Sequence, residues 1–435
     1  MTKPKNFLVI MGDHVRPDAL SCVGNPLART PHLDSLAARS VRFENCFTQA
    51  PVCSPARHSL ATGRYVHAHG VRNNKDKPYP GMVTIAHALQ PLGYRRIQIG
   101  QMHWGDPQMD NGYESWIHGE EWLATAPEAI RKRYEWENQS MTRRTTAGPS
   151  PREREHHSGH ARARRAIEQI QQAVAQDQPF LCWLAFSEPH PPFYPPRDIY
   201  ERFDQSRIPL PELPPAGAPA AHADVRRRQQ EFAHLTPVEI RQMIAGYYGM
   251  IELLDGYVGT VLEGIERLGI RDETAVIFTS DHGEQLGEHG LFTKFVMHEA
   301  SVRVPLLIHV PGNAPGVRDE LVEHVDVFPT VCEWLGAETP PTVHGRSLAP
   351  ILNGAAARGE WRDAVFSQIG ATRMIRTAKW KLNLYGAEPG ELYDMEKDPK
   401  EFFNRIADPS CAGIVKSLSG RVEAWAAATS ADGRP

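Results

Sequence analysis

The stretch CSPARHSLATGR, residues 53–64, is the most informative part of this chain of 435 residues. It joins the pattern C-x-P-x-R to a T-G-R tripeptide a few positions later. A cysteine is most often a small buried hydrophobic residue, so five matching positions say little when they stand alone. A functional interpretation of this stretch therefore depends on whether other parts of the sequence supply residues of the same site.

Short apolar, β-branched runs alternate with segments of helical spacing along most of the chain. Strands are expected at residues 7–11, 96–99, 180–186, 275–278 and 304–310, and helices at 33–38, 84–92 and 238–268. This alternation predicts an α/β fold with a large, mostly parallel sheet and helices on both of its faces.

The pattern changes after about residue 345. Residues 373–375 and 380–384 are expected to form antiparallel strands, and residues 414–427 a final helix. We therefore predict a catalytic α/β domain over residues 1–345 and a smaller α+β subdomain, an antiparallel sheet with a helix, over residues 346–435.

Two segments look like insertions. Residues 120–159 are charged without a clear period, and residues 209–224 are rich in proline and alanine. Both are expected to be surface loops, and long loops beside a site often determine which substrate it accepts.

Bulk properties exclude several classes of function. The net charge of −4 gives no broad basic field, so no nucleic-acid partner is expected. No apolar run approaches the roughly 18 residues of a membrane helix, and residues 1–11 lack a signal-peptide pattern. The six cysteines are scattered, which favours a reducing cytoplasm. A homo-oligomer remains open, because the sequence is silent on assembly.

Polar residues follow two of the expected strands. Asp13 and His14 come after the first strand, and Asp281 and His282 come after the strand at 275–278. Ligands gather at the carboxyl ends of strands in open α/β sheets. We expect these residues, next to the C-x-P-x-R loop, to form one metal site. Carboxylate oxygens suit a hard cation, and imidazole shifts the preference toward Mn²⁺ or Zn²⁺.

The wider pattern resembles the type I sulfatases of the alkaline phosphatase superfamily, a group related to the phosphonate monoester hydrolases. The resemblance rests on residues 53–64, on SDHGE at 280–284, on LGEHG at 286–290 and on Lys294. It also extends to the L-Y-D and D-P residues near the C-terminus. It implies an alkaline-phosphatase-like fold.

The resemblance also implies an unusual nucleophile. Cys53 would be oxidised to formylglycine by a formylglycine-generating enzyme, and one oxygen of the hydrated aldehyde would attack sulfur or phosphorus. The second hydroxyl would then expel the bound sulfate as the aldehyde re-forms, a route that a thiol lacks.

The resemblance assigns the site residue by residue. Arg57 positions the formylglycine, Lys294 binds the sulfate, and His103 and His190 are the candidate acid and base. Asn74 and Gln101 are candidate substrate-binding amides. The implied ligands of one Ca²⁺ or Mn²⁺ ion are Asp13, His14, Asp281, His282 and the modified Cys53.

Two positions depart from the family pattern. His14 stands where most sulfatases have a second aspartate, so the metal set either favours Mn²⁺ or loses this ligand. Gln101 stands where the family often has lysine, a change that phosphonate monoester hydrolases share.

The sequence therefore predicts a hydrolase of organic or aryl sulfate esters that acts on small molecules. The alternatives are a phosphonate monoester or phosphodiester hydrolase of the same fold, and a non-catalytic binding relative with an unmodified Cys53. A two-zinc phosphatase is disfavoured, because no second set of Asp and His residues follows the strands.

Overall fold

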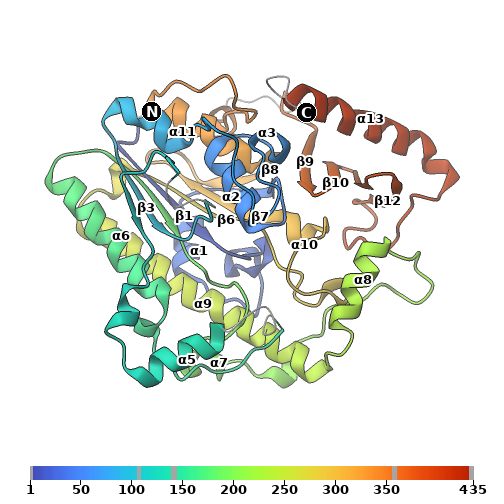
Figure 1. The fold of residues 1–435 in the computed structure, drawn as a ribbon, viewed down its shortest axis with the longest axis horizontal. Coiled ribbons are helices and arrows are strands. Elements are labelled where there is room, and N and C mark those ends of the chain that lie inside the picture. Colours follow the sequence, from blue (N-terminus) through green and yellow to red (C-terminus); the bar gives the residue numbers. More distant parts are fainter. Residues whose placement is uncertain (1–2, 105–108, 139–144, 355–359, 431–435) are drawn as a thin grey trace.

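A computed structural model describes residues 3–104, 109–138, 145–354 and 360–430, and two sheets organise them (Figure 1). The larger sheet has the strand order β4-β3-β5-β1-β6-β7-β2-β8. Neighbouring strands are parallel except where β7 pairs with β6 and with β2. The mostly parallel sheet expected from the sequence is therefore confirmed. Its strands are β1 (Asn6–Gly12), β2 (Val41–Phe47), β3 (Arg95–Gly100), β4 (Ser115–Ile117), β5 (Phe180–Ala185), β6 (Thr274–Ser280), β7 (Arg303–His309) and β8 (Gly316–Glu323).

The central strand β1 shows why this sheet is covered on both sides. Its side chains alternate between the faces, so Leu8 and Ile10 join one core while Phe7, Val9 and Met11 join the other. All five are fully buried. A strand that is buried on both faces has an unbroken run of apolar residues in its sequence, and residues 7–11 form such a run.

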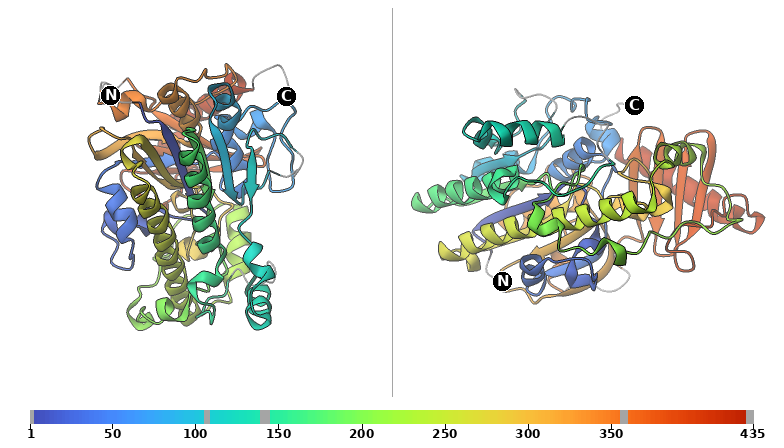
Figure 2. Two further views of the ribbon diagram at one scale, coloured as in Figure 1. Left: turned by 90° about the vertical axis from the view of Figure 1, so that its left-hand side faces the viewer. Right: turned by 90° about the horizontal axis from the view of Figure 1, so that it is seen from below.

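Helices cover the two faces (Figure 2). The Leu8 face packs against α1 (Pro31–Ala37), α6 (Ser158–Ala175) and α9 (Pro237–Arg267). The Val9 face packs against α2 (Cys53–Thr62), α4 (Ile85–Leu89), α11 (Val327–Leu335) and α12 (Ala349–Leu352).

The longest of these helices, α9, begins at a capping box. The Thr236 side chain accepts from the Glu239 backbone N–H, the Glu239 carboxylate reaches back to Thr236, and Pro237 occupies the first turn. Its buried stripe includes Leu254 and Val258. The predicted helix at 238–268 is thus confirmed.

The smaller sheet has the strand order β12-β11-β10-β9, and all of its pairs are antiparallel. Helix α13 (Ala412–Thr429) packs on it through Leu418 and Val422. This unit forms the red part of Figure 1. The C-terminal antiparallel sheet and helix are confirmed, whereas the domain boundary at residue 345 stays a prediction. The strands are β9 (Ala364–Ile369), β10 (Thr372–Thr377), β11 (Trp380–Tyr385) and β12 (Glu388–Asp394).

The prediction of a loop over residues 120–159 is wrong. The segment contains α5 (Glu128–Asn138), and α6 begins inside it at Ser158. Helix α5 has no apolar stripe for a periodicity argument to find; instead its buried Glu137 accepts hydrogen bonds from Ser150 and Arg152. Residues 209–222, by contrast, form no helix or strand, and α8 begins only at Ala223.

The remaining helical segments are short. They are α3 (Val66–His69), α7 (Arg197–Tyr200), α8 (Ala223–Phe232) and α10 (Glu299–Val302), with 3-10 turns at Pro17–Ala19, Ser21–Val23, Gln90–Leu92, Glu121–Ala124, Arg154–His156, Gln205–Arg207, Arg271–Glu273, Glu288–Gly290, His324–Asp326 and Pro409–Cys411. Within the described residues, no helix combines the length and apolar character needed to cross a membrane.

Candidate active site

Four neighbouring parallel strands deliver polar side chains to one edge of the larger sheet. Gly12 at the end of β1 pairs with Ser280 at the end of β6, so the residues that follow them lie side by side. These are Asp13 and His14, and Asp281 and His282. Strand β5 leads into the loop that carries His190, and β3 leads into Gln101 and His103.

Cys53 reaches the same edge from the first position of α2. Every residue of this helix is buried, and Cys53 itself is 2% exposed. The amino end of a helix carries partial positive charge and unpaired N–H groups, so it favours anions. The Asn74 side chain lies beside this end, where its Oδ1 accepts a hydrogen bond of 3.0 Å from the Ser54 N–H. Asn74 is exposed.

Four buried side chains form a cluster that can hold a metal. One ligand atom from each of Asp13, Cys53, Asp281 and His282 lies within 4.8 Å of all the others. The Cys53 Sγ is 3.3 Å from His282 Nε2 and 3.8 Å from Asp13 Oδ1. The His282 Nδ1 is 3.0 Å from the Gly283 carbonyl, an arrangement that keeps the proton on Nδ1 and leaves Nε2 as a donor atom for a metal.

Arg57 forms ion pairs with both carboxylates of this cluster. Its guanidinium lies 2.7 Å from Asp13 and 2.9 Å from Asp281, and it also donates to the Gln101 carbonyl. Burial and the charge of Asp281 raise the pKa of Asp13. At Asp281, burial is outweighed by His282, Arg57 and Lys294, which lower the pKa of its carboxyl. Burial also lowers the pKa of His282 to about 4, so its imidazole is neutral near pH 7.

Lys294 connects Cys53 to a second row of buried groups. Its ammonium lies 3.0 Å from the Cys53 Sγ and 2.6 Å from His14 Nε2. The other ring nitrogen of His14 is 2.6 Å from Glu284 Oε2. A neutral His14 with its proton on Nδ1 satisfies both contacts, because it accepts from Lys294 and donates to Glu284. Burial raises the pKa of Glu284 to about 7.

The two candidate acid–base histidines flank this group. The His190 Nδ1 lies 2.6 Å from the Pro191 carbonyl, and its ring meets His14 edge to face at 4.7 Å. Burial, together with the charge of Arg57, lowers the pKa of His103 to about 3. His103 has a backbone φ of +55°, and its carbonyl accepts from the Ser54 hydroxyl.

The structure thus brings most of the predicted residues together. His14 lies outside the four-residue cluster and instead groups with Asp13 and His190. Gln101 touches Arg57 through its backbone, and its side chain is exposed. Sequence reasoning passed over Glu284 as a functional residue, although it lies within the SDHGE motif.

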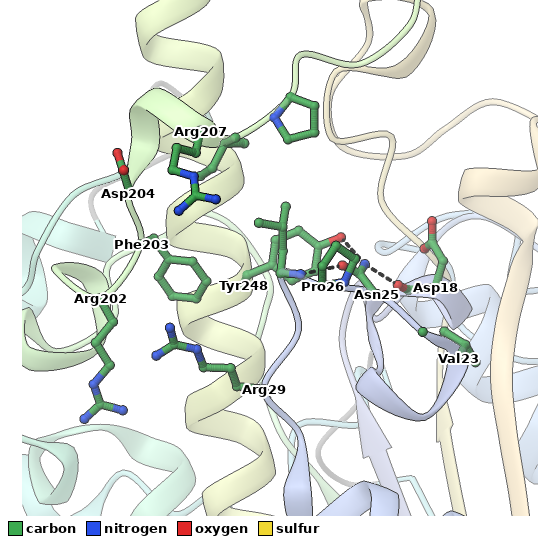
Figure 3. Close-up of a pocket in the computed structure, with 14 residues that line it drawn as sticks. Asp18, Val23, Asn25, Pro26, Arg29, Arg202, Phe203, Asp204, Arg207 and Tyr248 are labelled. Carbon is green, nitrogen blue, oxygen red and sulfur yellow. Dashed lines mark hydrogen bonds between the residues drawn. The ribbon is translucent and has the colours of Figure 1, made fainter.

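A large cavity lies away from this site. It measures about 720 Å³ between the loop at residues 23–29 and the segment at 202–209, with Tyr248 at its wall (Figure 3). None of the predicted site residues lines it. Cavity size alone therefore does not locate the chemistry of this molecule.

Comparison with protein families covers nearly the whole chain. Residues 5–337 match the family model described as Sulfatase. Residues 287–428 match the model described as N-sulphoglucosamine sulphohydrolase, C-terminal.

Individual relatives carry related descriptions. A choline-sulfatase of Rhizobium meliloti (strain 1021) is 28% identical, over 94% of this chain and 83% of its own. A multifunctional alkaline phosphatase superfamily protein of Trinickia caryophylli is 29% identical, over 97% and 95%. Among solved structures, the phosphonate monoester hydrolase of Agrobacterium radiobacter superposes with a TM-score of 0.81 at 26% identity, over 98% of this chain and 96% of its own.

Proposed function

The chain belongs to the sulfatase family, which makes it a sulfuric ester hydrolase, and we propose that it cleaves small-molecule sulfate esters at the Cys53 site. The observation that carries this proposal is the position of Cys53 at the buried amino end of α2. Its Sγ lies 3.0 Å from the Lys294 ammonium and 3.3 Å from His282 Nε2, within the cluster of side chains that can hold a metal. Preorganised positive groups of this kind stabilise the charge that develops on a sulfuryl group in transit.

We infer that one divalent cation belongs at this site. The donor set suits it, because two carboxylates and one neutral imidazole converge in a buried cluster where Arg57 is shared between both acids. Oxygen-rich donors favour Ca²⁺, and the imidazole favours Mn²⁺. Asp13, Asp281, His282 and residue 53 would hold the ion, which supplies a Lewis-acid charge for the ester oxygens. His14 stays a predicted ligand.

The Cys53 thiol is a poor reagent as it stands. Burial raises its pKa to about 12, so it is protonated near neutral pH. A sulfur adduct would also lack a second hydroxyl with which to release sulfate. We therefore propose that a formylglycine-generating enzyme converts Cys53 to formylglycine, whose hydrate supplies both the attacking oxygen and the releasing hydroxyl.

The surrounding residues stabilise charge on the substrate and position the catalytic groups. Lys294 neutralises charge on the sulfuryl oxygens, and Arg57 fixes the two carboxylates while its own charge faces the site. His14 and Glu284 orient the lysine ammonium. Asn74 and Gln101 remain predicted amides at the rim of the site.

We assign the leaving-group proton to His190. With Nδ1 held by the Pro191 carbonyl, a protonated His190 offers the Nε2–H for donation to the departing alcohol oxygen. Burial and the charge of Arg57 lower the pKa of His103 to about 3, so its imidazole is neutral near pH 7 and holds no proton to donate. The acid is therefore assigned to His190, and His103 stays a predicted residue of the site.

A second candidate function uses the same machinery on phosphorus. The Gln101 side chain brings no charge to a position where sulfatases often have lysine, and relatives include a phosphonate monoester hydrolase. A phosphonate monoester or phosphodiester hydrolase is therefore the alternative.

Two measurements test the proposal. The mass of the tryptic peptide spanning residues 43–57, from protein made together with a formylglycine-generating enzyme, should correspond to an aldehyde in place of one thiol. Values of kcat/KM for an aryl sulfate should exceed those for the matching phosphonate monoester and phosphodiester. An unmodified peptide would contradict the nucleophile, and a reversed order of substrates would establish the alternative.

A further inference from the structure

A small pocket adjoins the candidate active site at His190. Its volume is about 80 Å³, roughly that of two or three water molecules or a short aminoalkyl group. Glu188 and His190 line it from the loop after β5, while Tyr134 and Glu137 line it from α5. The His190 ring also contacts His14 of the candidate active site. The His190 side chain therefore lies between the pocket and that site.

Glu188 is the unusual member of this lining. It is 3% exposed, and its Oε2 has no hydrogen-bond partner within the described part of the chain. A buried carboxyl oxygen without a partner is costly, since desolvation is not repaid by a hydrogen bond. In native proteins such an atom calls for an explanation, and a bound ligand is one.

The nearby arginines are committed to other groups. Arg152 binds Glu137 and donates to the His156 carbonyl. Arg162 donates to the Ser187 hydroxyl and to the carbonyls of His118 and Ala185. None of these hydrogen bonds reaches Glu188, and the two arginines act on it only through their charge: burial raises the pKa of Glu188, while Arg162 and Arg152 oppose that rise.

The other walls carry charges of both signs, and Glu188 is the carboxylate among them with an unpaired oxygen in the described residues. Glu120 lines the pocket and lies 3.8 Å from Arg162, a long contact for an ion pair. Tyr134 and Tyr194 also line the pocket, and each ring already has a guanidinium over it: Arg152 lies 5.3 Å from the Tyr134 ring and Arg133 lies 5.5 Å from the Tyr194 ring. The single arginine of the lining, Arg152, pairs with Glu137, a carboxylate that Arg133 shares at 2.7 Å.

We propose that this pocket recognises a terminal ammonium group on the alcohol part of the substrate, with Glu188 Oε2 as its hydrogen-bond acceptor. The inference rests on the proposed function, because it places the leaving alcohol next to its proton donor, His190. The substrate class is then a sulfate ester of a short amino alcohol. Described residues of the segments 120–138 and 145–159 supply about half of the lining and so set this specificity.

The experiment compares 2-aminoethyl sulfate with propyl sulfate, which has the same number of heavy atoms but no charge. At about pH 7 the wild-type ratio of kcat/KM should favour the ammonium substrate by about 10- to 100-fold, the value of one charged hydrogen bond. Glu188→Gln should bring this ratio close to one. Glu252→Gln is the matched control, because Glu252 also has a buried oxygen without a partner in the described residues but lies outside the pocket.

Each outcome bears on the inference. A wild-type ratio near one, or a ratio unchanged in Glu188→Gln, would overturn it while leaving the proposed function intact. An equal preference for 2-hydroxyethyl sulfate would also overturn it, because the selection would then be for a hydroxyl group. If no sulfate ester is turned over, the proposed function fails, and calorimetric binding of the same two esters to wild type and Glu188→Gln still decides whether the pocket selects ammonium.

Discussion

Lys294 is the residue whose replacement best separates catalysis from stability. Its side chain is 3% exposed, and its ammonium lies 3.0 Å from the Cys53 Sγ and 2.6 Å from His14 Nε2. Among the described residues, no carboxylate lies within ion-pairing distance of it. Lys294→Met keeps the length and the apolar stem of the side chain and removes only the charge and its hydrogen bonds.

The expected loss follows from the distance. At an effective dielectric constant of about 20, a unit charge 3.0 Å from the ammonium interacts with it by about 5.5 kcal/mol. With about half of a charge developing at that point in the transition state, the interaction contributes about 2.8 kcal/mol. This value agrees with the roughly 2.7–4 kcal/mol measured when one oxyanion donor is removed from an enzyme. We expect kcat to fall by about 100-fold.

The assay is steady-state hydrolysis of an aryl sulfate, with urea unfolding measured on the same samples. Lys381→Met is the control, because Lys381 is fully buried and lies 3.1 Å from Glu299 and 2.8 Å from Glu401, in the C-terminal sheet. Breaking a buried ion pair should lower the free energy of unfolding by about 3–5 kcal/mol without changing kcat of the folded enzyme. A Lys294→Met enzyme within tenfold of wild-type kcat would refute the reasoning, and so would an equal loss of kcat in Lys381→Met.

Three further predictions concern other parts of the site. Asp281→Ala removes a carboxylate from the metal-binding cluster, so the affinity for Ca²⁺ or Mn²⁺ should fall by at least about 100-fold. Elemental analysis after dialysis should then find less bound metal than in the wild type, and unchanged metal content would count against the site. Burial raises the pKa of Glu284 to about 7, so the native state keeps a proton that the unfolded chain releases above about pH 4.5, and stability is lost as the pH rises through that window. Glu284→Gln has no such proton to lose. The free energy of unfolding of this variant, relative to that of the wild type, should therefore rise by up to about 3 kcal/mol between about pH 4.5 and 7. Parallel pH profiles of the two proteins would disprove the raised pKa of Glu284. Asn74→Ala removes the acceptor of the Ser54 N–H and should cost about 0.5–2 kcal/mol in urea unfolding, whereas Asn73→Ala, which alters contacts within the same exposed loop, should cost less.

The sequence predicted the central strands well, because burial on both faces makes them unbroken apolar runs. The strand β2 escaped prediction for the opposite reason. It contains Arg42, Glu44 and Asn45, and only part of it is buried. Helix α6 escaped as well, although its buried residues, among them Ala163, Ala166 and Ala173, recur at helical spacing.

The candidate site was readable where motif residues follow strands, as at Asp13 and Asp281. The partners that orient those residues were not readable. Glu284 reaches His14 across 270 positions of sequence, and the role of Glu188 depends on arginines that are occupied elsewhere. Contacts of this kind depend on three-dimensional packing, so no local pattern in the chain encodes them.

The burial of Cys53 has a consequence for the order of events during synthesis. A modifying enzyme must draw residues 53–57 into its own cleft, yet in the folded chain every residue of α2 is buried and Cys53 is 2% exposed. If Cys53 becomes formylglycine, oxidation must precede the closure of the sheet around it. Molecules that fold first would then be trapped as inactive thiols. The active fraction of a preparation would be set by a race between folding and modification, and slowing the folding of the nascent chain should raise it.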